Sequence, residues 1–297
     1  MPQPLLERIA RSQNWLEPTA DWLQKLVTGI YSGLGGSGRQ LKSLLNGTFI
    51  LRHPLHPALT DVPIGAWTVG VIADYAAHFT SRIPESAGDI ALAVGLIVAL
   101  AALITGYTDF MDTLALERRF ATAHGLTMTL VIAIDAVSMF LRWFAGAGAH
   151  PVAVALSTVG WVLVLVGAWY GGHVVFGTGY AVNREAFLDG PSDWADAGAA
   201  ADIPVAGLHV AEAGGMQVLL VREGARICAL SDVCSHAGGP LHEGTLQNGI
   251  VQCPWHSSRF RIRDGRAVGG PATFDQPVLE VREVDGRVMV KLESPLH

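Results

Sequence analysis

Two short stretches near the C-terminal end of the sequence carry the residue types that bind metals. Cys234 and His236 form a C-x-H pair, and Cys253 and His256 form a C-x-x-H pair. Two thiolates and two imidazoles can hold either Zn²⁺ or a [2Fe–2S] cluster. A zinc finger more often presents C-x-x-C and H-x-x-x-H, so one Cys and one His from each of two loops favours the iron–sulfur cluster, with zinc as the alternative.

The stretch CSHAGGPLHEGTLQNGIVQCPWH (234–256) resembles the Rieske family closely. The resemblance covers about residues 203–293 and includes GGPA at 269–272, which is similar to the proline loop that covers the cluster. It implies a [2Fe–2S] cluster on a small all-β fold. The ligands that it implies are Cys234 and Cys253 on one iron and His236 and His256 on the other.

Four further positions indicate which Rieske type this is. The respiratory type has an extra cysteine in each cluster loop, and the two form a disulfide; Gly239 and Trp255 stand in those places here. The stretch therefore resembles the ferredoxin and dioxygenase type. Ser258 matches a serine whose hydroxyl can donate to a bridging sulfide, whereas Phe260 replaces a tyrosine donor. With fewer donors, we expect a midpoint potential toward the lower end of the roughly −150 to +300 mV Rieske range.

Rieske domains often serve oxygenases, which also need a mononuclear iron held by two histidines and a carboxylate. That iron usually sits in a catalytic domain after the Rieske domain. The stretch that follows His256 in this sequence is too short for such a domain. We therefore expect an electron-transfer component of an oxidoreductase system, not a Rieske oxygenase acting on its own.

The rest of the chain has the composition of a membrane protein. Hydrophobic residues make up 50% of the 297 residues and charged residues only 15%, and the mean hydropathy is positive. This composition indicates membrane spans. The net charge of −6 gives no sign of nucleic-acid binding. The three cysteines argue against a disulfide scaffold and fit a reducing compartment.

The expected fold is an α-helical membrane bundle with four transmembrane helices, followed by the small all-β Rieske domain. Four apolar stretches are each near the roughly 20 residues that cross a bilayer; they lie at about 63–80, 88–107, 124–144 and 152–175. The predicted parts are an amphipathic surface helix and loop at 1–45, the membrane domain at 46–182, a linker at 183–202 and the Rieske domain at 203–297. The linker is predicted from its acidic, small and Pro/Gly-containing composition.

Basic residues on one side of the predicted spans set the orientation. They are Arg8, Arg11, Lys25, Arg39, Lys42, Arg52, Arg118, Arg119 and Arg184, against Arg82 and Arg142 on the other side. Loops rich in Lys and Arg stay in the cytoplasm. We therefore expect a multi-pass protein of the bacterial inner membrane, with both termini and the Rieske domain in the cytoplasm.

The segment HPLHPALTDVPIGAW (53–67) resembles the signature of a bacterial four-span membrane family without settled function, over about residues 45–185. The resemblance implies the architecture and little about the chemistry. The span count places His56, His124 and His173 at the cytoplasmic ends of three helices. Paired histidines inside a four-helix bundle often hold haem b, so these three are candidate haem ligands. The alternatives are a non-haem metal and histidines that only bond to backbone.

Together these features predict a membrane-anchored Rieske protein that transfers electrons between a cytosolic donor or acceptor protein and a membrane acceptor. That acceptor would be a bound haem or a quinone. The alternative is a redox sensor or regulatory Rieske domain on a membrane anchor or transporter.

Overall fold

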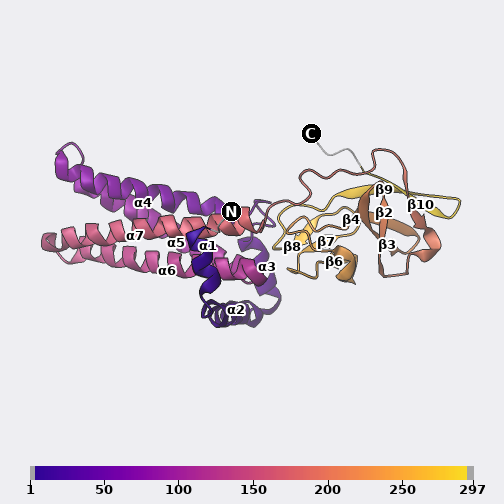
Figure 1. Ribbon diagram of the computed structural model, residues 1–297, viewed down its shortest axis with the longest axis horizontal. Helices are drawn as coiled ribbons and strands as arrows, with labels where there is room; N and C mark the ends of the chain where they lie inside the picture. Colours follow the sequence, from indigo (N-terminus) through magenta and orange to yellow (C-terminus); the bar gives the residue numbers. More distant parts are fainter. Residues whose placement is uncertain (1–3, 293–297) are drawn as a thin grey trace. The chain divides into compact units, whose positions relative to one another are not determined.

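The computed structural model of the chain describes residues 4–292 and divides into two compact units (Figure 1). The helical unit comprises the residues up to 35 and residues 55–178, and the β unit comprises residues 36–54 and those from 179 onward. Residues 36–54 therefore belong with the C-terminal part of the chain, although they precede the long helices in the sequence.

The helical unit is built on four long helices: α4 (Leu55–Phe79), α5 (Glu85–Phe110), α6 (Ala115–Phe144) and α7 (His150–Gly172). The short helix η1 (Ala147–Ala149) precedes α7, and the π-helical turn η2 (His173–Gly177) follows it. α4 packs along α5, and α6 packs along α7. Gly95 lets the indole of Trp67 lie directly on the α5 backbone, because a Cβ at Gly95 would meet Trp67 Nε1 at 2.6 Å. Such small residues allow the close helix packing found in membranes.

Three segments of the described chain are long and apolar enough to cross a membrane: α5, α6 and the continuous stretch Ala147–Gly177. α4 is also long, at 25 residues, but it contains Pro63 and Asp74 within its length. It is not among the three candidates. A fourth span therefore remains a prediction.

The predicted surface segment at 1–45 forms three helices: α1 (Leu5–Ser12), α2 (Leu16–Gly33) and α3 (Gly35–Leu45). α2 is fixed to the long helices, since Gln24 Nε2 donates to the carbonyls of Phe110 at 3.1 Å and Thr113 at 2.9 Å. Its other face exposes apolar side chains, namely Trp22, Leu26 and Ile30. An exposed apolar face on a bundle-packed helix fits the predicted amphipathic surface helix. α3 differs from the prediction because it lies almost wholly in the β unit.

The β unit contains two antiparallel sheets. The larger has the order β1-β10-β9-β4-β3-β2 and the smaller the order β5-β6-β7-β8. The strands are β1 (Ala195–Ala199), β2 (Leu208–Ala213), β3 (Met216–Glu223), β4 (Arg226–Ser231), β5 (Thr245–Gln247), β6 (Ile250–Gln252), β7 (Arg259–Arg261), β8 (Ala267–Gly269), β9 (Val278–Val284) and β10 (Arg287–Leu292). Asp285 and Gly286 both take positive φ in the β9–β10 turn, as a two-residue Asp-Gly hairpin requires.

The segment predicted as the linker, 183–202, is folded over much of its length. Ala195–Ala199 forms β1 at the edge of the larger sheet and pairs with β10. The Arg184 N–H donates to the Ser235 carbonyl at 3.0 Å. The composition suggested a coil because small residues make weak strand signals, but an edge strand needs only backbone pairing on one side. The Rieske fold therefore begins before residue 203.

Candidate metal centre

Each predicted cluster pair lies in a loop that follows a strand. Cys234 and His236 follow β4, and Cys253 and His256 lie between β6 and β7. The two loops close in the same way. The Cys234 carbonyl accepts from an N–H four residues on, and the Cys253 carbonyl does the same, at 2.8 and 3.2 Å. The Cys234 and Cys253 N–H groups each donate across their own loop, at 2.9 and 2.8 Å. Two matched turns thus present the two pairs.

The four side chains converge in the interior. Their exposed fractions are 1% for Cys234, 3% for His236, 1% for Cys253 and 5% for His256. The His236 and His256 ring centroids lie 4.9 Å apart. The two thiols are in hydrogen-bond contact, which lowers the pKa of the Cys253 thiol. Burial lowers the pKa of His236 to about 3, so its imidazole is neutral, as a metal ligand requires.

Backbone donors surround both sulfurs. The N–H groups of His236 and Ala237 are directed at the Cys234 sulfur, and those of Trp255 and His256 at the Cys253 sulfur. Such donors stabilise thiolate and tune the potential of iron–sulfur clusters.

Buried ring nitrogens without a hydrogen-bond partner also indicate that these four side chains suit a bound metal group. Both ring nitrogens of His236 are buried and have no hydrogen-bond partner among the described residues. A buried polar atom without a partner costs roughly 1–3 kcal/mol, which a metal bond to one nitrogen would relieve. Two sulfurs and two imidazoles in one pocket suit a [2Fe–2S] cluster of the mixed Cys/His kind, with zinc as the other chemistry that the donors allow.

The other motif residues lie around this pocket. Ser258 is fully buried, and its Oγ accepts the N–H of Ala272 at 3.1 Å, which ties the GGPA loop to the second ligand loop. Phe260 is fully buried on β7. Only glycine fits at position 239, because a Cβ there would lie 2.9 Å from the Cys253 sulfur and 3.0 Å from the Trp255 ring.

The sequence did not indicate Tyr180, which meets both histidines edge-on. Its ring centroid lies 4.9 Å from that of His236 and 6.1 Å from that of His256. No spacing pattern links residue 180 to the ligand loops. The only available sequence signal for this residue was a single tyrosine just after the last apolar stretch.

In the helical unit, two of the three predicted haem ligands come together. The ring centroids of His56 and His124 lie 5.9 Å apart. His56 Nδ1 is 2.9 Å from the Ala102 carbonyl, and His124 Nδ1 is 2.8 Å from the Gly167 carbonyl. His173 instead stacks on Trp169 at 5.1 Å and packs against Phe120 at 4.3 Å between ring centroids.

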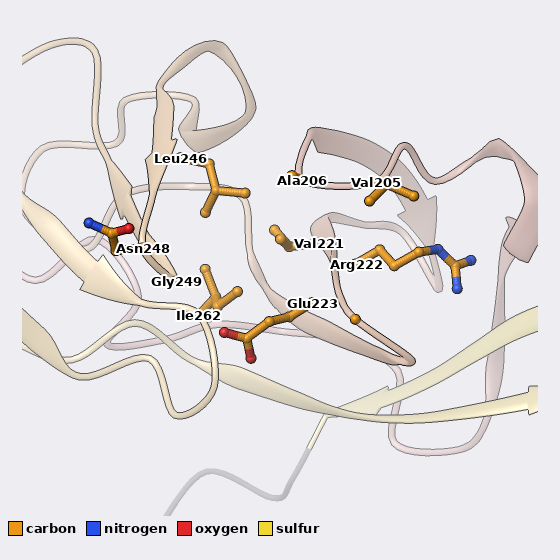
Figure 2. A pocket seen from close by; sticks show the side chains of 10 residues that line it. Val205, Ala206, Val221, Arg222, Glu223, Leu246, Asn248, Gly249 and Ile262 are labelled. Carbon is orange, nitrogen blue, oxygen red and sulfur yellow. The ribbon is translucent and has the colours of Figure 1, made fainter.

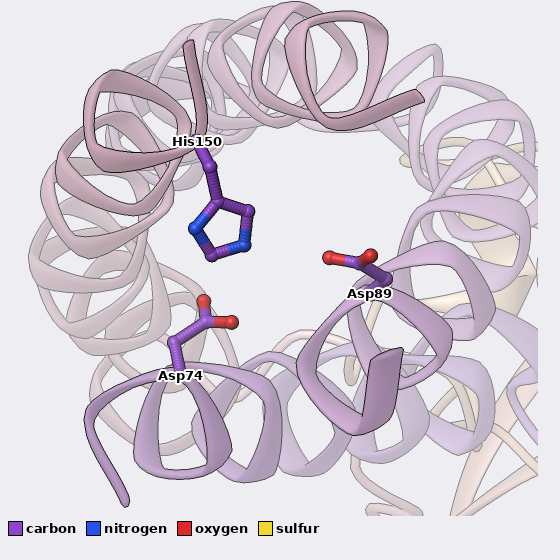
Figure 3. Close-up of side chains that lie close together, drawn as sticks. All are labelled: Asp74, Asp89 and His150. Atoms are coloured by element: carbon purple, nitrogen blue, oxygen red, sulfur yellow. The ribbon is translucent and has the colours of Figure 1, made fainter. Parts of the chain in front are cut away.

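A second polar cluster lies elsewhere in the helical unit, where Asp74, Asp89 and His150 point toward one another (Figure 3). One ligand atom from each lies within 4.8 Å of the others. The fully buried Arg142 binds Asp74 through two nitrogens, at 3.0 and 2.5 Å, and Asp89 at 2.8 Å. Because the guanidinium already neutralises carboxylate charge there, the cluster is a buried ion-pair network.

A surface hollow lies in the β unit (Figure 2). Val221, Leu246 and Ile262 supply apolar walls, and Arg222 and Glu223 lie at its side. None of the four cluster residues lines it, so it does not give access to the metal centre.

Glu185 is a buried carboxyl of the β unit, and its Oε2 has no hydrogen-bond partner among the described residues. Burial raises its pKa to about 7 from the ordinary 4.5, against a weaker opposing hydrogen bond with Ser231. Since the folded pKa is raised above the unfolded one, folding binds a proton in this window. The contribution of Glu185 to stability is therefore present below about pH 4.5 and lost as the pH rises through about 7.

We expect Glu185→Gln to stabilise the β unit at pH 8 by about 1–2 kcal/mol, with a smaller gain at pH 5. Denaturant unfolding at both values measures this, and Glu212→Gln on the exposed side of β2 is the matched control. A Glu185→Gln protein that is less stable than wild type at pH 8 would show that the carboxylate is stabilised in place.

Two family models match the chain. Residues 193–283 match the Rieske [2Fe-2S] domain, and residues 52–184 match the family described as a predicted membrane protein (DUF2231). Both resemblances expected from the sequence are confirmed. The first match begins just before β1, in keeping with the folded segment described above.

The β unit is similar to ferredoxins of dioxygenase systems. The chain is 30% identical over 101 residues to the ferredoxin component of naphthalene 1,2-dioxygenase/salicylate 5-hydroxylase systems from Ralstonia sp, covering 34% of this chain and 97% of that protein. It is 36% identical over 80 residues to the anthranilate 1,2-dioxygenase ferredoxin subunit from Burkholderia cepacia, covering 27% and 74%. A solved complex of reduced oxygenase and oxidized ferredoxin in carbazole 1,9a-dioxygenase aligns at 29% identity and a TM-score of 0.33, over 36% of this chain and 99% of the matched chain.

Proposed function

Because this chain belongs to the Rieske [2Fe-2S] domain family and also carries a DUF2231 membrane domain, we propose that it transfers single electrons between a cytosolic protein and an acceptor in the membrane. The main observation behind this proposal is that two buried Cys/His pairs converge on two similarly closed loops. The relatives that support the proposal are named as ferredoxin components, whose task is electron delivery to a partner.

The proposed cluster ligands are the four converging residues, with the thiolates of Cys234 and Cys253 on one iron and the imidazoles of His236 and His256 on the other. The cluster supplies a one-electron redox centre when bound. The chain's own contribution is to bury both imidazoles, which keeps that of His236 neutral, and to hold both sulfurs within reach of backbone N–H groups. These donors stabilise negative charge on sulfur and so favour the reduced state.

The proposed membrane acceptor site is the His56–His124 pair. A carbonyl can only accept a hydrogen bond, so each Nδ1 carries a proton, and in the neutral ring the lone pair then lies on Nε2. Metal-ligating histidines are commonly oriented by such a bond to a backbone carbonyl. This tautomer therefore favours a haem iron over a quinone carbonyl as the acceptor. His173 is left out of this pair, since it packs on Trp169 and Phe120.

The visible spectrum of the purified protein tests the acceptor site. If haem is the acceptor, we expect a Soret band that is lost in His56→Ala and His124→Ala and kept in His173→Ala and in the control His78→Ala. After rapid reduction of the cluster, the haem band should follow. A haem that survives both pair substitutions contradicts the ligand assignment. A haem that stays oxidised beside a reduced cluster, despite a favourable potential gap, contradicts electron transfer between them.

The proposed location is the bacterial inner membrane, with both termini and the Rieske domain in the cytoplasm. The bias of Lys and Arg described above supports this orientation. A C-terminal reporter that is active only in the periplasm would overturn it.

Ser258 is expected to raise the cluster potential. Its oxygen accepts from Ala272, so its own proton is available to donate. A lost hydrogen bond to a charged group is worth roughly 1.5 kcal/mol, which is about 60 mV for a one-electron couple. We therefore expect Ser258→Ala to lower the midpoint potential by about that amount. Ser257→Ala, at the exposed neighbouring serine, is the control, and equal potentials in all three proteins would contradict this role.

A further inference from the structure

The histidine edge of the metal centre is covered by the chain itself. His236 and His256 are at most 5% exposed, although they are the most exposed of the four proposed ligands. Tyr180 stands edge-on against both rings and is itself 6% exposed. Electron tunnelling falls off steeply with distance. Whatever lies over this edge therefore decides which partner can exchange electrons with the cluster.

A second segment, residues 36–54, binds the GGPA loop and places Lys42 near His236; it is called the strap below. Thr48 Oγ1 donates to the Ala272 carbonyl at 3.0 Å, and Ser43 Oγ accepts the Gly270 N–H at 3.3 Å. Ser43 and Thr48 are 4% and 3% exposed. Polar side chains so deeply buried, each bonded to the loop backbone, mark a fitted contact.

The strap also approaches the loop closely and pairs charge with it. A Cβ at Gly270 would lie 2.7 Å from Thr48 Oγ1, so only glycine allows this approach. Arg52 forms an ion pair with Asp275, just after the GGPA loop. The strap is thus held to the loop by hydrogen bonds, close packing and opposite charges.

Two cations face this edge. Lys42 of the strap and Arg184 both lie close enough to His236 to act on it electrostatically. The cluster gains one negative charge when it is reduced. Positive groups at the covered edge therefore favour the reduced state.

We infer that the strap and Tyr180 close the histidine edge of the cluster against separate soluble redox proteins. This inference rests on the proposed function. Both covering segments run directly into the helical unit in the sequence. Pro54 precedes the first residue of α4, and Gly179 follows the residue after η2. A soluble donor must then use another face of the β unit.

The test is the relaxation of the reduced cluster's EPR signal by a water-soluble gadolinium complex, on the full chain in detergent. In wild type we expect weak enhancement. The double variant Thr48→Val/Arg52→Ala should raise it severalfold by loosening the strap. Arg261→Ala is the matched control, because Arg261 also pairs with an exposed aspartate, Asp264, in the same unit. Equal enhancement in wild type, control and strap variant overturns the inference.

Tyr180 gives an independent pair of variants. Tyr180→Phe keeps the ring over the histidines and should match wild type, whereas Tyr180→Ala should raise the enhancement. Both proteins should retain the EPR signal, which shows that the β unit is folded and loaded. A wild-type protein without any Rieske signal would refute the proposed function itself. A wild-type signal that the gadolinium complex relaxes strongly would refute only the inference about the covered edge.

Discussion

Replacing His236 or His256 by alanine abolishes the Rieske EPR signal, which is the first of the two largest effects that we expect. The two rings are buried 4.9 Å apart, and neither ring nitrogen of His236 has another partner among the described residues. Each variant removes one of the two proposed nitrogen ligands of an iron, and no other histidine in the described part of the chain is part of this converging group. The signal should fall to background, with a matching loss of iron and acid-labile sulfide from the purified protein.

His209→Ala is the matched control, because His209 lies on β2 of the same unit and outside the ligand loops. The control should keep the full signal. If His236→Ala or His256→Ala keeps a full and unchanged signal, the ligand assignment is wrong.

Arg142→Leu is expected to cause the largest loss of stability in the helical unit. The side chains of Arg142 and Asp74 are fully buried, and Arg142 is bonded to Asp74 and Asp89. Removing the cation leaves two carboxylates facing each other without compensation. Breaking a buried ion pair in this way costs about 3–5 kcal/mol. Unfolding of the purified protein in mixed detergent micelles, followed by circular dichroism, measures the loss.

The triple variant Arg142→Leu/Asp74→Asn/Asp89→Asn should recover most of the stability, since replacing a whole buried network by neutral groups is often close to neutral. Arg82→Ala in the exposed loop before α5 is the control and should change little. A single Arg142→Leu variant as stable as wild type would contradict the stabilising role of this ion-pair network.

The convergence of the four candidate ligands was predictable because their pattern is local in the sequence. The ligand types and spacing at Cys234, His236, Cys253 and His256 lie within two short loops, and each loop is closed by its own backbone bonds. The small all-β fold was implied by the resemblance to the Rieske family. The long apolar helices were predictable from length and hydropathy, although α4 carries too many polar residues to stand among the candidate spans.

What the sequence could not show depends on contacts between distant residues. Thr48 binds Ala272 across more than two hundred residues, and no pattern in 36–54 indicates that partner. Asp74 binds Arg142 on another helix, whereas in the sequence Arg142 stood out only as a basic residue on one side of the spans. His173 shares a level with His56 and His124 in the span count, yet the π-helical turn that it begins directs it onto Trp169.

The most direct test of the central claim is EPR spectroscopy with metal analysis on wild-type protein purified from membranes of cells with intact cluster assembly. We predict iron and acid-labile sulfide in equal amounts and, after reduction, the signal of a [2Fe–2S] cluster with mixed sulfur and nitrogen ligands. Stoichiometric zinc, with neither iron nor acid-labile sulfide, would contradict the account.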